Sequence, residues 1–194
     1  MSESAIDPKE LIMLAAQHIF ARYGFKKATI DEIAKAAHKA KSSIYHYFDS
    51  KEDIFREILE KESVQLNQEI MNAVRVADTP QTKINAYVIT RMQTLQSLIN
   101  YYGALKDDYL ENYSFIEKIR KKQDDTEKSI IKSILKEGVD IGIFTIKNLD
   151  VTAFAIFTAL KGLEYSWLTE KDSNEIKEHI ANLLEILFYG IETR

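Results

Sequence analysis

The sequence predicts an all-α fold of about nine helices. Its 194 residues include only 6 glycines and 2 prolines, whereas alanine, leucine, lysine and glutamate are abundant. The abundant residues have high helix propensity, while glycine and proline interrupt helices. Apolar residues also recur at the 3.6-residue period of an amphipathic helix, and no alternation typical of a strand persists beyond a few residues. We therefore expect helices along the whole chain.

The first expected helix covers residues 8–23. Asp7 is a typical N-cap residue, and Pro8 suits the first helical position because its fixed φ is already helical. An apolar stripe at helical period follows, and Gly24 supplies the expected end of the helix.

Two short helices joined by a tight turn are expected over residues 29–48. Thr29 and Glu32 form a capping box that opens the first, and a break near His38 separates it from the second. This arrangement is a helix-turn-helix. Helices so short are not stable alone, so their apolar residues must pack on the neighbouring helices. Those inward residues are Ile33, Ala34, Ala37, Ile44 and Phe48.

The rest of the chain is expected to form six helices, each marked by a cap or a breaker. They comprise a fourth helix from residue 51 to about 76, a fifth from 80 to about 103, a short sixth around 105–109, a seventh from 114 to before 142, an eighth capped by Asp150 and a ninth from about 173. We place the domain boundary at the start of the fourth helix, which gives domains at 1–52 and 53–194.

Positive charge is concentrated around the helix-turn-helix. The whole chain has a net charge of −4, but residues 22–51 carry seven basic and three acidic side chains, a local charge of +4. Such local charge is typical of a nucleic-acid-binding module attached to an acidic body.

The second short helix keeps a polar face once its apolar residues are turned inward. Lys41, Ser42, Ser43 and His46 remain on that face. All four side chains can form hydrogen bonds with bases, and the small serines would let the backbone approach base edges in a major groove. The segment therefore predicts a DNA-reading helix.

These segments resemble the tetracycline-repressor (TetR) family of bacterial regulators. The matching residues are Phe20–Phe25, Ala28–Ala37 and Ile44–Ile54, and the similarity covers about residues 8–56. The resemblance implies a ligand-responsive transcriptional regulator, a repressor that a small effector releases from double-stranded operator DNA. The alternatives are a helical adaptor that binds only protein and a transcriptional activator without effector release.

The resemblance also implies roles in DNA binding. Thr29 would offer its hydroxyl to a phosphate, and Lys51 would grip a phosphate beside the positive end of the fourth helix. Of Tyr45 and Tyr47, one would bind a phosphate while the other packs inside. Lys39 would either contact a phosphate or point to solvent. The residues expected to face the major groove are Lys41, Ser42, Ser43 and His46.

Three positions depart from the family pattern. His38 and Ser42 stand where glycine is common, and Lys39 stands where an apolar residue is common. A left-handed backbone is tolerable for histidine but strained relative to glycine. We therefore expect strain in the turn at His38.

The C-terminal part is richer in large apolar residues than a scaffold needs. In the family that the chain resembles, helices five to eight enclose a small-molecule pocket, and apolar cavities with a few polar groups are the usual ligand sites. We expect a pocket for a small hydrophobic or aromatic effector, with plain core packing as the alternative for any single residue. The candidate lining residues are Tyr87, Met92, Leu95, Ile99, Tyr102, Leu105, Tyr109, Phe157, Lys161 and Tyr165.

The last two expected helices carry a predicted homodimer interface. Residues 151–168 are nearly all apolar, and a helix apolar around most of its circumference must be covered on two sides. Glycine within a helix costs about 1 kcal/mol relative to alanine, and close helix approach would explain Gly162. Two copies of each helix would form a four-helix bundle. The candidate residues are Phe154, Gly162, Leu163, Trp167, Leu183, Leu184, Leu187 and Phe188.

The sequence gives little support to other classes of function. The chain has no cysteine, which excludes disulfides, thiolate catalysis and Cys-ligated zinc. Its four histidines have no carboxylate at catalytic or metal-ligand spacing, so we expect no enzyme activity, no metal and no cofactor. No apolar run reaches the roughly 18 residues of a membrane span. We therefore expect no membrane association and a cytoplasmic location.

Overall fold

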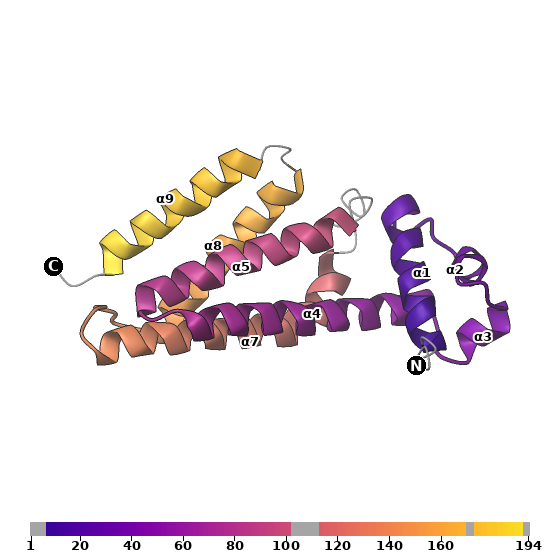
Figure 1. The fold of residues 1–194 in the computed structure, drawn as a ribbon, viewed down its shortest axis with the longest axis horizontal. Helices are drawn as coiled ribbons and strands as arrows, with labels where there is room; N and C mark the ends of the chain where they lie inside the picture. Colours follow the sequence, from indigo (N-terminus) through magenta and orange to yellow (C-terminus); the bar gives the residue numbers. More distant parts are fainter. Residues whose placement is uncertain (1–6, 102–112, 170–172, 192–194) are drawn as a thin grey trace, which may run out of the picture. The chain divides into compact units, whose positions relative to one another are not determined.

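The computed structural model describes residues 7–101, 113–169 and 173–191, and its regular structure there is helical. This confirms the predicted all-α fold. The helices, labelled as in Figure 1, are α1 (Pro8–Tyr23), α2 (Ile30–Ala36), α3 (Lys41–Tyr45), α4 (Lys51–Val76), α5 (Pro80–Tyr101), α7 (Tyr113–Asp140), α8 (Leu149–Thr169) and α9 (Ser173–Ile191). The sixth expected helix, around residues 105–109, falls outside the described residues.

The chain divides into two compact units. Unit 1 comprises Met1–Ser63 and Leu98–Arg120, and unit 2 comprises Val64–Ser97 and Lys121–Arg194. The helix α4 continues from one unit into the other. The units therefore divide inside α4, and the predicted domains at 1–52 and 53–194 stay a prediction.

The ends of α1 follow from local sequence. Asp7 Oδ1 accepts a hydrogen bond of 3.0 Å from the Lys9 backbone N–H, and Pro8 begins the helix. At the other end, Gly24 adopts a φ of 78° and donates its N–H to the Phe20 carbonyl at 2.9 Å. Glycine adopts this backbone at no steric cost, so the helix ends where it was expected to end.

The core of unit 1 surrounds three phenylalanine rings. The Phe55 ring lies 5.5 Å from that of Phe20, edge to face, and 4.8 Å from that of Phe25. Aromatic pairs in such tilted geometries add to the stabilisation that their burial supplies. The short helices pack on this core as predicted, because all five of their expected inward residues are buried: Ile33, Ala34, Ala37, Ile44 and Phe48.

In unit 2, α7 is followed by a tight turn that folds the chain back onto the end of the helix. Gly142 has a φ of 76°, and the N–H groups of Ile143 and Phe144 both donate to the Gly138 carbonyl. A Cβ on Gly138 would lie 2.1 Å from an atom of the buried Phe144 ring. Only glycine at this position lets the ring close over the end of the helix.

The predicted cap of α8 is wrong by two residues. The side chain of Asn148, and not that of Asp150, accepts the helical N–H of Val151 at 3.1 Å. Asp150 instead forms an exposed ion pair with Lys132 of α7 at 2.6 Å. Both Asn and Asp are good N-caps, so the sequence pattern alone did not choose between them.

Candidate nucleic-acid interface and interior cluster

The turn between α2 and α3 depends on His38. This residue has a φ of 52°, and it is the one described residue other than glycine with a positive φ. Its N–H donates to the Lys35 carbonyl at 3.2 Å, and the Lys39 N–H reaches back to the Ala34 carbonyl at 2.9 Å. These two bonds form a Schellman motif with His38 in the left-handed position. The expected location of strain in the turn is confirmed.

Replacing His38 with glycine is expected to raise the free energy of unfolding by about 0.5–1 kcal/mol, because relief of the left-handed strain outweighs the greater chain entropy of glycine. Urea denaturation followed by circular dichroism measures the change. The control is His38→Ala, which removes the imidazole but keeps the Cβ and should give no gain. Equal gains in both variants would show that the side chain, and not the backbone, is the cause.

The N-terminus of α2 is closed by a complete capping box. Thr29 Oγ1 accepts the Glu32 N–H at 3.2 Å, and Glu32 Oε2 accepts the Thr29 N–H at 2.9 Å. The Thr29 hydroxyl also donates to the same carboxylate oxygen at 2.8 Å. The capping role predicted for Thr29 is confirmed, and its phosphate contact stays a prediction.

The residues predicted to contact DNA lie together around α3 in unit 1. Ser43 is half-buried, whereas the other residues on or beside this helix are exposed: Lys39, Lys41, Ser42, Tyr45, His46 and Tyr47. Lys41 forms an exposed ion pair with Asp31 of α2 at 3.0 Å. The hydrogen bond and the charge of Asp31 raise the pKa of Lys41, so this side chain remains a cation.

One predicted role, that of the tyrosine pair, needs correction on geometric grounds. Of the two tyrosines, one was expected to pack inside, but Tyr45 is 50% exposed and Tyr47 is 36% exposed. The inward aromatic position of this segment belongs to Phe48. The Tyr47 ring instead packs edge to face on the imidazole of His46, with centroids 5.0 Å apart. Both tyrosines are thus exposed on the surface of unit 1.

Lys51 contacts the segment between α1 and α2. Its ammonium donates to three backbone carbonyls of the segment between α1 and α2, those of Phe25 at 2.7 Å, Lys26 at 3.2 Å and Ala28 at 3.0 Å. It also lies 4.6 Å from the centre of the Phe25 ring. An ammonium has three donors, and these carbonyls take all three. The predicted phosphate contact of Lys51 stays a prediction.

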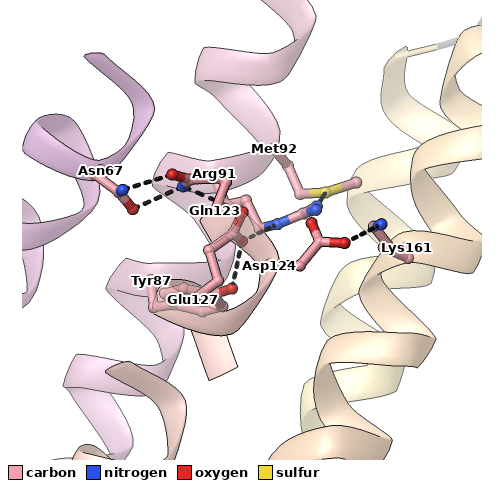
Figure 2. A network of polar contacts seen from close by, with 8 residues as sticks. All are labelled: Asn67, Tyr87, Arg91, Met92, Gln123, Asp124, Glu127 and Lys161. Carbon is pink, nitrogen blue, oxygen red and sulfur yellow. Dashed lines mark hydrogen bonds and ion pairs between the residues drawn. The ribbon is translucent and has the colours of Figure 1, made fainter. Parts of the chain in front are cut away.

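The interior of unit 2 contains a polar cluster that the sequence did not reveal (Figure 2). The Arg91 and Glu127 side chains are each 2% exposed and form an ion pair of 2.6 Å between α5 and α7. The Tyr87 hydroxyl donates to the same carboxylate at 2.7 Å. Burial, followed by the charge of Glu127, raises the pKa of Tyr87 far above its ordinary value. Tyr87 therefore stays a neutral donor.

Two further contacts extend this cluster to the neighbouring helices. Asn67 of α4 and Gln123 of α7 exchange a reciprocal pair of amide hydrogen bonds of 2.6 and 2.7 Å. Lys161 of α8 pairs with Asp124 of α7 at 2.5 Å, and Figure 2 shows the Asp124 carboxylate on the same side of α7 as Arg91. Polar side chains therefore connect α4, α5, α7 and α8 within unit 2.

The predicted pocket residues fall into two groups. Tyr87, Met92, Leu95 and Phe157 are buried, and Lys161 is half-buried, with its ammonium 5.4 Å from the centre of the Phe157 ring. The side chains of the others are outside the described part of the structure: Ile99, Tyr102, Leu105, Tyr109 and Tyr165. Arg91 was missed, although it lies between apolar residues of α5 and four positions after Tyr87, on the same face of the helix.

The predicted dimer residues differ in how far they are exposed in one chain. Phe154 is 59% exposed, and nothing lies within 4 Å of a Cβ placed on Gly162, so this face of α8 is uncovered in one chain. Leu184 is buried within the unit, which removes it from an interface. Leu163, Leu183, Leu187 and Phe188 are half-buried, and the side chain of Trp167 lies outside the described residues. Exposed apolar residues that the prediction omitted are Val151, Ile186 and Tyr189.

Two kinds of site were searched for in the described residues. No group of three or more His, Cys, Asp or Glu side chains there is placed to hold a metal ion. None of the helices in the described ranges is long and apolar enough to cross a membrane.

Comparison with known proteins agrees with this geometry. The sequence model of "Bacterial regulatory proteins, tetR family" matches residues 12–58, which contain the helix-turn-helix. The chain is 30% identical over 155 residues to the HTH-type transcriptional repressor KstR2 of Mycolicibacterium smegmatis, covering 77% of this chain and 73% of the relative. It is 28% identical over 187 residues to an uncharacterized HTH-type transcriptional regulator of Bacillus subtilis, YhgD, covering 94% and 95%.

Solved structures show the same fold. A TetR transcription regulator from Haloarcula marismortui superposes with a TM-score of 0.82 at 17% identity, covering 96% of this chain and 99% of that one. The helix-turn-helix, the fold and the full-length sequence relatives agree with one another. The chain therefore belongs to the tetR family of bacterial regulatory proteins and is a DNA-binding transcriptional regulator.

Proposed function

We propose that the protein is a homodimeric repressor that a small hydrophobic or aromatic effector releases from operator DNA. The observation that carries this proposal is the exposed polar and basic surface around α3. The inward apolar residues of the same helix-turn-helix are all buried in the core of unit 1. Repression in particular is supported by the relative KstR2, whose name describes a repressor.

The reading surface has two proposed parts. Lys41, Ser42, Ser43 and His46 face base edges in the major groove, where short polar side chains at the N-terminus of a recognition helix make their contacts. The residues proposed to bind phosphates are Thr29, Lys39, Tyr45, Tyr47 and Lys51. Phosphate contacts fix the register of the helix on the duplex, and base contacts select the sequence.

The proposed effector site lies in unit 2. Met92, Leu95 and Phe157 are buried apolar residues. The Tyr87 hydroxyl, which bonds Glu127, and the Lys161 ammonium, 5.4 Å from the centre of the Phe157 ring, are the proposed polar groups. Such a mixture suits a ligand that is mainly hydrophobic. Binding must favour the state that does not bind DNA, and a change from 99:1 to 1:99 requires about 5.5 kcal/mol of differential affinity.

The dimer is proposed to form through α8 and α9. Ile186 and Tyr189 of α9 are each 71% exposed, and Val151 and Phe154 of α8 are also exposed. Pairing two copies buries this apolar surface in an isologous interface. The two reading helices then address half-sites about 34–36 Å apart on a near-palindromic operator.

Replacing Ile186 with aspartate is expected to convert the dimer to a monomer, because each interface would gain two unpaired charges. Light scattering at micromolar concentration should report a mass near 22.4 kDa for the variant and about twice that for the unaltered protein. The control is Ile89→Asp, the same change at a half-exposed site on α5. A monomeric unaltered protein would contradict the two-half-site model.

The central experiment combines DNA binding with effector identification. Genomic fragments selected by the purified protein should yield one recurring near-palindromic duplex, bound at least 1,000-fold more tightly than random DNA. Native mass spectrometry of the purified protein should show a co-purified small molecule, and adding this molecule should release the duplex. Failure to bind any DNA would favour a protein-binding adaptor, and unchanged binding with the ligand present would exclude effector release.

A further inference from the structure

An exposed ion pair joins the two helices of the helix-turn-helix. The Lys41 ammonium of α3 lies 3.0 Å from Oδ2 of Asp31, a residue of α2. The Asp31 side chain is 68% exposed, and that of Lys41 is 51% exposed. Pairs as exposed as this contribute little to stability, because water screens the charges and holding two flexible side chains costs entropy. Stabilisation of the fold is therefore a weak reason for this pair.

The pair places an acid beside residues that are proposed to contact DNA. Thr29 is proposed to bind a phosphate, and Lys41 is proposed to face base edges. The neighbouring acid, Glu32, is held in the capping box, whereas the exposed carboxylate of Asp31 is bonded to the reading helix. A carboxylate this close to bound DNA is repelled by the phosphates. Asp31 therefore weakens DNA binding unless a base donates a hydrogen bond to it.

The charged atoms of the pair match the major-groove edge of a C·G base pair. That edge presents cytosine N4 as a donor, followed by guanine O6 and N7 as acceptors. N4 and O6 bond each other within the base pair, so they lie about 2.9 Å apart, and the charged atoms of Asp31 and Lys41 lie 3.0 Å apart. The carboxylate can accept from N4. An ammonium has three donors, so beside the one given to Asp31 it can donate to both O6 and N7.

The other base pairs fit these two side chains less well. An A·T pair also presents a donor and an acceptor side by side, adenine N6 and thymine O4. The thymine methyl group then stands where guanine would offer N7, so the ammonium loses one bond. Reversing either pair, to G·C or T·A, puts an acceptor opposite the carboxylate. The C·G pair therefore forms the largest number of hydrogen bonds with Asp31 and Lys41.

We infer that Asp31 and Lys41 read one base pair together, in which Asp31 selects cytosine on one strand and Lys41 selects the guanine paired with it. This inference rests on the proposed reading surface around α3. It adds Asp31 of α2 as a residue that determines specificity, and it requires a cytosine at one fixed position in each half-site of the operator.

Selection from a DNA library tests the inference without a known operator. The probe is a duplex library with about 20 random base pairs, enough for two half-sites one helical turn apart, and the full-length protein selects from it. The unaltered protein should prefer C·G at one position of each half-site by about tenfold. Asp31→Asn should lose this preference, and adenine on the same strand should gain most, because an amide bonds adenine N6 and N7. Lys41→Met should lose the preference for guanine at the same base pair.

A matched control separates base reading from a general effect of charge. Glu52→Gln removes one negative charge from an exposed side chain of α4 in the same unit, and it should change the affinity equally for every sequence. If Asp31→Asn selects the same motif as the unaltered protein, or if Asp31→Asn and Lys41→Met alter different base pairs, the inference is overturned while DNA reading by α3 stands. If the unaltered protein selects no recurring motif, the proposed reading surface fails, and the inference fails with it.

Discussion

Replacing Glu127 with glutamine is expected to lower the free energy of unfolding by about 3–5 kcal/mol, a large share of the 5–15 kcal/mol typical of a folded domain. The substitution keeps the shape of the side chain, so it creates no cavity. It removes the negative charge that pairs with Arg91 at 2.6 Å in a site where both side chains are 2% exposed. The guanidinium then loses the ionic contact that Glu127 supplies in a medium of low dielectric constant.

Denaturation in urea, followed by circular dichroism, measures this loss, and two further variants identify its cause. Glu137→Gln makes the same change on the same helix, in an ion pair with Lys83 where the carboxylate is 40% exposed, and should cost less than about 1 kcal/mol. The double variant Arg91→Met, Glu127→Leu removes both buried charges and should recover most of the stability. Equal losses at Glu127 and Glu137 would contradict the importance of burial.

The buried pair of Arg91 and Glu127 shows which kind of contact in unit 2 could not be predicted from sequence patterns. The 3.6-residue period places position 91 on the inward face of α5, together with Tyr87 and Leu95. The period does not identify the partner, because Glu127 lies 36 residues further along the chain. Pairing across that distance depends on the packing of α5 against α7, and no local signal encodes it.

Local signals were more successful at the ends of helices. The capping box at Thr29, the cap at Asp7 and the end of α4 at Val76 all follow from a few adjacent residues, and the structure confirms them. The positive φ of His38 was likewise expected from its place in the turn. Local sequence fixes these features because the atoms that form them are neighbours along the chain.

The backbone contacts of Lys51 were not predicted, for a related reason. Its position at the start of α4 suggested a phosphate contact, since cations and helix N-termini both attract anions. The carbonyl acceptors that it binds are 23–26 residues earlier in the chain. Their convergence results from how α1 and α4 pack around Phe20, Phe25 and Phe55, which is a tertiary effect.

Replacing Ser42 with glutamate is expected to weaken DNA binding at least 100-fold, which corresponds to about 2.7 kcal/mol. Ser42 is exposed on α3, in the middle of the proposed reading surface, and its side chain has no part in the core. The carboxylate would lie in the major groove between two rows of phosphates, and like-charge contacts in interfaces cost several kcal/mol. Fluorescence anisotropy with the selected duplex measures the loss.

Two comparisons separate a reading role from a general charge effect. Ser129→Glu makes the same change on an exposed residue of α7 in unit 2 and should leave DNA affinity nearly unchanged. Ser42→Ala removes only the hydroxyl, so it should change the preference at one base pair by about 1–3 kcal/mol while other positions keep theirs. If Ser42→Ala weakened binding equally on every duplex variant, Ser42 would contact the backbone and not the bases. The selectivity of α3 would then depend on Lys41, Ser43 and His46, since these are the other residues of this helix and its C-terminal end that are proposed to face the base edges.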